Sequence, residues 1–214
     1  FSEIGYLAGV HATDWSWAPL FADLDNDSHK DLLITNGIYR RPNDLDYINY
    51  VGNEAVQASL AKGITSENLG IIEQMPRVPL ANYAYRNDGD LGFTNVAAAW
   101  GLAQPGFSNG AVYVDLDDDG ALDLVVNNVG APASVYRSRA RERTGNHFLQ
   151  VRLRGAGANT AGIGAKVLVR HGGAKQMVEQ MPTRGFQSSV DARLHFGLGA
   201  STRVDSLIVV WPDR

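Results

Sequence analysis

The stretch Asp115-Leu-Asp-Asp-Asp-Gly-Ala-Leu-Asp123 places carboxylates at its first, third, fifth and ninth positions. A near copy, Asp23-Leu-Asp-Asn-Asp-Ser-His-Lys-Asp31, lies 92 residues earlier in the chain. Short apolar and partly β-branched segments flank both stretches, at residues 19–22, 32–35, 110–114 and 124–126. Segments of this kind are typical of buried strands. The sequence therefore predicts two acidic loops, named here loop one (residues 23–31) and loop two (residues 115–123), each set between two β-strands.

The similarity between the two loops extends into an internal repeat. Residues 1–36 align with residues 93–128 without a gap, and the pairing matches Phe1 with Phe93. A second pair of similar triplets, Tyr85-Arg-Asn87 and Tyr136-Arg-Ser138, is separated by only 51 residues, so the first copy carries an insertion of 41 residues. A repeat of about 50 residues has the size of one propeller blade.

The inserted segment, about residues 38–80, has a helical rather than a β pattern. Asn43 or Asp44 is a candidate N-cap for a first helix, and Thr65 or Ser66 for a second that ends before Pro76. The apolar positions expected on one face of these two helices are Leu45, Ile48, Val51, Ala55 and Leu60, and then Leu69, Ile71, Ile72 and Met75. The sequence gives no indication of what the insertion does.

The last 70 or so residues change pattern again. Strand-like alternation occurs at residues 147–153, 165–169, 193–196 and 204–210, with glycine-rich turns between these segments. Several short strands at close spacing predict a compact β-sandwich. A polar run at residues 138–145 separates this region from the repeats, so we expect a repeat domain at residues 1–140 and a small β domain at residues 141–214.

The pattern of carboxylates in the two loops predicts two calcium sites. Calcium takes six to eight oxygen ligands, mostly from carboxylates and carbonyl groups, and alternate positions of a tight loop converge on one point. The predicted ligands are the side chains of Asp23, Asp25, Asp27 and Asp31 with the carbonyl of His29, and the side chains of Asp115, Asp117, Asp119 and Asp123 with the carbonyl of Ala121. Zinc is disfavoured because the chain has no cysteine and no paired histidines.

The loops are not EF-hands, although their spacing is similar. An EF-hand has a glutamate at its twelfth position and helices on both sides, whereas these twelfth positions are Ile34 and Val126, within predicted strands. The sixth position favours glycine because its φ is positive. Gly120 meets this demand and Ser28 does not, which predicts weaker calcium binding by loop one.

The repeat resembles the FG-GAP/VCBS type found in integrin-like β-propellers. The residues that carry this resemblance are the two acidic loops, the lead-ins from Phe1 and Phe93, and the segment Tyr85-Arg-Asn-Asp-Gly89. The C-terminal part resembles the ASPIC/UnbV domain through residues 146–149, 162–167, 185–188, 194–199 and 204–212. The combination of modules is similar to that of large secreted bacterial proteins and of cartilage acidic protein. The resemblance implies a mainly β protein, with a partial propeller followed by the small domain, secreted or at the cell surface, whose blades bind calcium.

Composition and charge narrow the function classes. Residues 1–136 have a net charge of −12 and residues 137–214 of +8, and no apolar run is long enough to span a membrane. The acidic half would repel phosphate and the basic residues form no helical stripe, so nucleic-acid binding is not expected. Only two acidic loops are present where a full propeller would have several, so a closed propeller is not expected from this chain alone.

Three functions remain open. The first is a non-enzymatic extracellular module for binding or adhesion, with a polysaccharide or another surface protein as partner. Its candidate contact residues are Trp15, Trp17, Trp100 and Tyr113, whose alternative role is core packing, and Arg152, Arg154, Lys166, Arg170 and Lys175, which equally suit solvated strand edges. The second is a structural subunit of a larger extracellular assembly. The third is a polysaccharide-processing enzyme, for which the candidate acid–base residues are His11 near Asp14, His147, His171 and His195.

Overall fold

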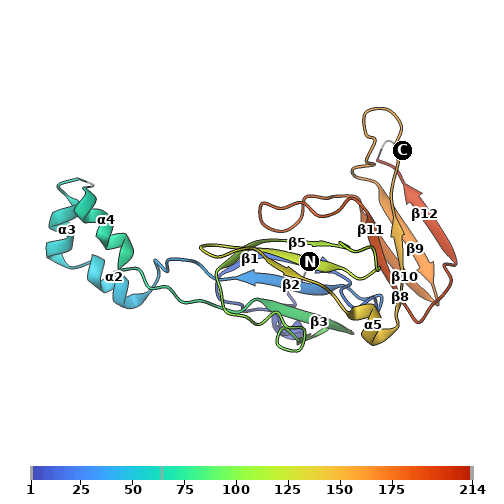
Figure 1. Ribbon diagram of the computed structural model, residues 1–214, viewed down its shortest axis with the longest axis horizontal. Coiled ribbons are helices and arrows are strands. Elements are labelled where there is room, and N and C mark those ends of the chain that lie inside the picture. The colour runs from blue at the N-terminus through green and yellow to red at the C-terminus, as the bar shows by residue number, and fades with distance from the viewer. Residues whose placement is uncertain (1, 64, 213–214) are drawn as a thin grey trace.

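The structure is a computed structural model that describes residues 2–63 and 65–212 (Figure 1). It is mainly β, as the sequence predicts, and its strands within these residues form four sheets, none of them closed. Phe1, the first residue of the predicted repeat, lies outside the described residues. The helices of the first half are α1 (Gly5–Ala8), α2 (Leu45–Val51), α3 (Glu54–Leu60) and α4 (Ser66–Glu73).

Two sheets make up the repeat region. The first has the order β1-β2-β3-β4 and consists of Ser16–Ala22, Asp31–Asn36, Tyr83–Gly89 and Gly92–Asn95. The second has the order β5-β6-β7 and consists of Ser108–Val114, Asp123–Asn128 and Ser134–Tyr136. All neighbouring strands are antiparallel, so each sheet is a meander. A four-stranded meander is also the form of a propeller blade, although open sheets alone neither make nor exclude a propeller.

The three strands of the second meander correspond to the first three strands of the first, as the internal repeat predicts. Leu32 pairs with Tyr85 in the first sheet, and Leu124 pairs with Tyr136 in the second. The irregularity that follows Ser16 in β1 recurs after Ser108 in β5. The alignment offsets of 92 and 51 residues thus correspond to equivalent positions in two similar sheets.

The two repeat sheets share one hydrophobic core. Strands β1 and β2 pack against β5, which brings the inner faces of the two sheets together. The buried residues of this core come from both sheets, from the two acidic loops and from the segment between β4 and β5: Ala18, Leu20, Ala22, Leu24, Leu33, Ala84, Ala97, Leu102, Ala111, Leu122, Leu124 and Val126. Small side chains on β1 and β5 allow the close approach of the two sheets.

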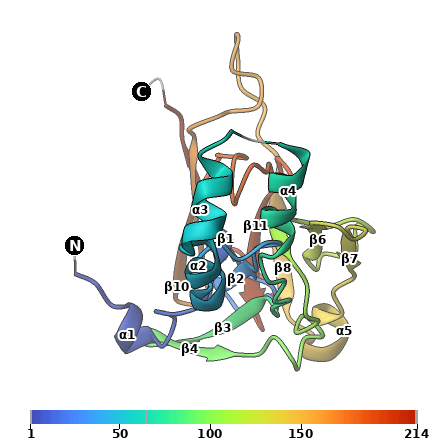
Figure 2. The same cartoon turned by 90° about the vertical axis from the view of Figure 1, so that its left-hand side faces the viewer.

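The insertion between β2 and β3 is helical, but it contains three short helices where the sequence predicts two. The expected first helix divides at Gly52, because the side chain of Asn53 accepts a hydrogen bond from Ala55 N and caps a new helix, α3. Asp44 and Thr65 cap α2 and α4, as predicted. The helices extend away from the sheets (Figure 1), and they lie in front of the sheets when the molecule is viewed from that side (Figure 2). Their apolar side chains Leu45, Ile48, Leu69 and Ile72 are exposed.

The C-terminal region forms two further sheets. Helix α5 (Ala140–Thr144) connects it to the repeats. One sheet has the order β10-β9-β12, and the other pairs β11 with β8. The strands are β8 (His147–Val151), β9 (Lys166–His171), β10 (Ala174–Glu179), β11 (Leu194–Gly199) and β12 (Ser206–Val210). Residues from both sheets form a second core around the fully buried Phe196, so the two sheets pack face to face.

The segment between β10 and β11 returns from the C-terminal region to the repeats. Phe186, at its tip, packs against the repeat core, and its ring centroid lies 4.7 Å from that of Trp17. Gly185 has a φ of 74°, and a Cβ there would lie 3.1 Å from Leu20 Cδ2. In Figure 1 this segment runs above β5 and β1 toward the insertion. The C-terminal region therefore supplies one side chain to the core of the first half.

No helix in residues 2–63 and 65–212 is long and apolar enough to cross a membrane.

Candidate metal centre

The two acidic loops occupy equivalent positions in the two sheets. Loop one connects β1 to β2, and loop two connects β5 to β6. The last strand pairs before the loops are Ala22 with Asp31 and Val114 with Asp123. Both loops therefore begin where a buried strand ends, and both return into a buried strand.

The aspartate at the ninth position of each loop, Asp31 or Asp123, is buried. Its carboxylate connects the loop by hydrogen bonds to a later segment of the same repeat. In loop one, Asp31 Oδ2 accepts from Leu24 N (2.9 Å) and Oδ1 accepts from Asn87 N (3.0 Å). In loop two, Asp123 accepts from Leu116 N (2.9 Å) and from Ser138 N (2.7 Å). The two Tyr-Arg triplets therefore lie at equivalent positions, because the main-chain N–H of the residue after each arginine donates to the loop.

The first aspartate of each loop holds the turn. Asp23 accepts from the main-chain N–H groups of Asp27 (3.0 Å) and Ser28 (2.9 Å). Asp115 accepts in the same way, from Asp119 N (3.1 Å) and Gly120 N (3.0 Å). Hydrogen bonds of this kind define a tight turn in which the other carboxylates face inward.

The structure brings three predicted ligand side chains together in each loop. Carboxylate oxygens of the two groups, Asp23, Asp25 and Asp27 and then Asp115, Asp117 and Asp123, lie within 4.8 Å of one another in each group. Asp31 and Asp119 are not members of these groups. Apart from the strand-to-strand hydrogen bonds of the sheets, no hydrogen bond to the carbonyl oxygen of His29 or of Ala121 occurs in the described part of the chain. An all-oxygen set of carboxylates and carbonyls fits a hard cation such as calcium.

Burial raises the pKa values of carboxyl groups in loop one, and a bound cation would stabilise their ionised forms. Burial, with smaller contributions from Asp27 and Asp25, raises the pKa of Asp23 to about 7. Burial also raises the pKa of Asp31 to about 8, with Asp25 contributing. The pKa of Asp25 is raised for the same reasons, burial first and Asp27 second. Three carboxylates therefore resist ionisation together, and a divalent cation would stabilise their charged forms.

Loop two has protein cations close to its carboxylates. Arg137 forms ion pairs with Asp117 (2.7 Å) and Asp119 (3.2 Å). Its counterpart in the first repeat, Arg86, instead pairs with Asp88 (2.6 Å). A metal ion in loop two would share Asp117 with Arg137, whereas in loop one Asp25 has no ion pair among the described residues. Arg137 is not among the residues predicted to contact the loops, although the recurring Tyr-Arg triplet that contains it is a signal for such a contact.

The sixth position of both loops has the expected left-handed backbone. The φ of Ser28 is 85° and that of Gly120 is 83°. Ser28 is therefore a non-glycine residue in a conformation that favours glycine. Its hydroxyl donates to Gly197 O across 3.2 Å, a contact with the C-terminal region that partly offsets the strain.

The C-terminal region rests directly on loop one. Asn146 Nδ2 donates to Asp25 O (2.9 Å), and Gly199 N donates to Asn26 O (2.8 Å). The side chain of Asn26, which is fully buried, accepts from His195 Nε2 (2.6 Å) and donates to Gly120 O of loop two (2.9 Å). One asparagine thus links both loops and strand β11.

The same region also contacts loop two. Gln150 of β8 donates to Asp115 Oδ2 (2.7 Å). Arg193 donates to Asp115 O (2.9 Å) and forms an ion pair with Asp118 (2.5 Å). The ring of Phe148 lies over Gly120, where a Cβ would be 1.9 Å from Phe148 Cε1. The C-terminal region therefore packs directly against both acidic loops.

The candidate acid–base histidines lie in separate surroundings. His195 is half-buried, and desolvation of its ring, with a smaller effect of Arg193, lowers its pKa to about 4. His171 is buried and contacts Gln176 (2.9 Å), while His11 stacks on Tyr6. No two of these histidines hydrogen-bond to each other in the described residues. The arrangement gives His195 a packing role between β11 and loop one.

The candidate aromatic contacts divide into two groups. Trp17 and Tyr113 are partly buried; Tyr113 packs on the core and Trp17 on Phe186. Trp100 also packs on the core and in addition lines a cavity beside loop one. The basic candidates are mostly exposed on the C-terminal sheets, where Lys175 of β10 pairs with Arg170 of β9.

Comparison with known proteins identifies the C-terminal region. Residues 155–214 match the model of the family described as ASPIC and UnbV, so this part of the chain is an ASPIC/UnbV domain. The match covers strands β9 to β12 and the returning segment with Phe186. Among curated proteins, none matches the chain.

Proposed function

We propose that the chain is a non-enzymatic, calcium-stabilised module for binding or adhesion, secreted or displayed at the cell surface. In this proposal the two meanders are propeller blades of the FG-GAP/VCBS type, and a polysaccharide or another surface protein is the partner. The observation that carries the proposal is the pair of equivalent acidic loops, each with three converging carboxylates, against which the ASPIC/UnbV domain packs through Arg193 and His195.

The two proposed calcium sites would act on structure rather than on chemistry. When bound, calcium would neutralise the buried carboxylates and fix each loop. The residues that would hold it are those predicted from the sequence, with Asp23, Asp25 and Asp27 converging in loop one and Asp115, Asp117 and Asp123 in loop two. Because Gln150, Arg193 and His195 contact the loops from the C-terminal region, fixed loops would also fix that region.

Glycan-array binding tests the proposed partner class. The protein is applied in a calcium-containing buffer and again after addition of EGTA. We expect binding to a subset of glycans that is lost with the chelator. Absence of glycan binding in both buffers would exclude the polysaccharide partner and leave only the protein-partner form of the proposal.

Calorimetric calcium titration compares the two sites. We expect loop one to bind about fivefold more weakly than loop two, because Ser28 holds a left-handed conformation at a penalty on the order of 1 kcal/mol. Titration of Asp115→Ala reports loop one, and titration of Asp23→Ala reports loop two. The Ser28→Gly variant is the matched control and should reduce the difference. A weaker loop two would show instead that competition from Arg137 dominates.

A structural subunit of a larger assembly is the second candidate. The observation that favours it is the exposed apolar surface of the insertion, with Leu45 70% and Leu69 52% exposed. Monomeric proteins seldom expose clustered apolar side chains without a partner. Size-exclusion chromatography with and without calcium distinguishes the two candidates, since an assembly subunit would elute as an oligomer.

A further inference from the structure

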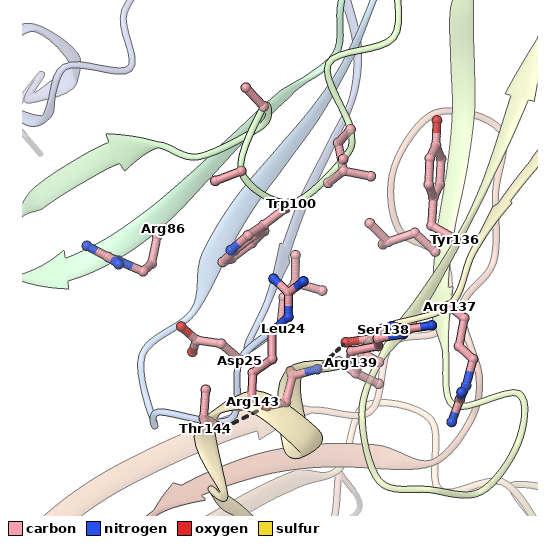
Figure 3. A pocket seen from close by; sticks show the side chains of 17 residues that line it. Leu24, Asp25, Arg86, Trp100, Tyr136, Arg137, Ser138, Arg139, Arg143 and Thr144 are labelled. Atoms are coloured by element: carbon pink, nitrogen blue, oxygen red, sulfur yellow. Dashed lines mark hydrogen bonds between the residues drawn. The ribbon is translucent and has the colours of Figure 1, made fainter.

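A cavity of about 500 Å³ lies between the two repeat sheets, beside loop one (Figure 3). Its walls come from loop one, β3, the segment between β4 and β5, β7 and α5. Binding sites for small molecules and cofactors have volumes of roughly 300–1,000 Å³. The cavity is therefore large enough for a small ligand, and neither the family match nor the acidic loops account for it.

The lining of this cavity is strongly cationic. Four arginines, Arg86, Arg137, Arg139 and Arg143, line it, against the single acidic side chain of Asp25. Three of the arginines have carboxylate partners nearby: Arg86 pairs with Asp88, Arg137 with loop two, and Arg139 with Glu142 at 4.0 Å. Arg143 belongs to none of the ion pairs among the described residues and is exposed. Its guanidinium is thus available to a ligand.

The cavity also has aromatic walls. Trp100 and Tyr136 are half-buried, pack against the repeat core and line the cavity. In the view of Figure 3, Trp100 lies between Arg86 and Tyr136. Packing on the core holds the two rings in place, which reduces the entropy lost when a ligand binds. A rigid apolar face next to guanidinium groups suits a flat-sided ligand that carries an anionic group.

We propose that this cavity binds an acidic sugar unit of a polysaccharide, a uronate, with its carboxylate on Arg143 and its ring against Trp100. The planar fork of a guanidinium matches a carboxylate, which gives charge-assisted hydrogen bonds. An inorganic anion would contact the arginines but not the aromatic walls. A neutral sugar would contact the aromatic walls but not pair with the arginines. The inference rests on the proposed function and specifies the class of its partner.

Calorimetry with digalacturonate tests the site, with free calcium held constant. We expect the disaccharide to bind, its neutral methyl ester to bind at least tenfold more weakly, and the affinity to fall with added salt. Arg143→Gln should weaken binding of digalacturonate by at least about tenfold, because the charge-assisted hydrogen bonds of the guanidinium are lost. Arg203→Gln is the matched control, since Arg203 is 85% exposed and outside the cavity. This control should bind like the unmodified protein.

Three outcomes would overturn the assignment. The first is equal binding by Arg143→Gln and the unmodified protein. The second is stronger binding of polyglutamate than of digalacturonate, which would assign the cavity to an acidic peptide. The third is no binding of digalacturonate while calcium still stabilises the protein and the array still detects a glycan. In that last case the cavity assignment fails and the proposed function stands. Thermal unfolding of both variants confirms that each is folded.

Discussion

Replacement of Gly197 by alanine is expected to release the ASPIC/UnbV domain from the acidic loops. Gly197 lies in β11, directly against loop one. A Cβ at this position would lie 2.0 Å from Asp23 Oδ2 and 2.6 Å from Asn26 Cα. The backbone of Asn26 cannot move aside, because Asn26 O accepts from Gly199 N and its side chain bonds to Gly120 and His195. Overpacking of this kind destabilises by about 3 kcal/mol.

Amide hydrogen exchange provides the measurement for Gly197→Ala. The amide of Gly199 is the reporter, since it donates across the interface to Asn26 O. We expect its protection to fall while amides inside β9 retain theirs. Gly106→Ala is the matched control, because a Cβ there meets nothing within 4 Å and its φ is not left-handed. Unchanged protection at Gly199 in the Gly197→Ala variant would contradict the docking described here.

Calcium is expected to raise the free energy of unfolding by about 5 kcal/mol when each site is saturated a hundredfold above its Kd. For a chain of this length, the melting temperature should rise by roughly 10–20 °C. The Asp23→Asn variant, which removes one ligand from loop one, should lose about half of the increase. A melting temperature that is the same in calcium and in EGTA would contradict the proposed metal sites.

The calcium effect should depend on pH in a defined direction. The pKa of Asp23 is raised to about 7 and that of Asp31 to about 8, so without calcium the folded chain binds more protons than the unfolded chain between about pH 4 and pH 8. The unfolding free energy in EGTA therefore falls as the pH rises through this window, by on the order of 4 kcal/mol for Asp23 alone. Calcium keeps the carboxylates ionised and should remove this decline.

Denaturant titrations at pH 5, 6, 7 and 8, in EGTA and in calcium, measure this dependence. The difference between the two buffers should widen with pH. The Asp23→Asn variant is the control, since an amide does not titrate and its stability in EGTA should vary less. Stability in EGTA that increased from pH 5 to pH 8 would show that the carboxylates of loop one ionise without a cation.

Local patterns made much of the fold predictable. Short apolar segments directly next to alternating aspartates predict a strand beside each loop. The structure has β2 and β6 at those positions. The left-handed turn at Ser28 and Gly120 also follows from the loop pattern alone. The apolar spacing through Ala55 and Leu60 predicts one continuous helix, whereas the side chain of Asn53 caps a separate helix, α3.

Contacts between distant parts of the sequence could not be predicted in the same way. Asn26 and His195 are 169 residues apart, and nothing in either local pattern relates them. The packing of the sheets determines where the ASPIC/UnbV domain contacts the acidic loops. It also determines the position of the cavity lined by Arg143. The pKa of Asp31 likewise depends on burial by neighbours, which composition does not reveal.

The position of Phe186 has a consequence for the biogenesis of the protein. The repeat sheets are complete at Tyr136, yet Phe186, the residue that covers Trp17, is made 50 residues later. While the chain is synthesised or exported in the N- to C-terminal direction, the first half therefore emerges with part of its apolar surface uncovered. A chain stopped before residue 186 should therefore bind a holdase chaperone more strongly than a chain that includes the returning segment. The returning segment thus completes the core of the repeat region late in synthesis.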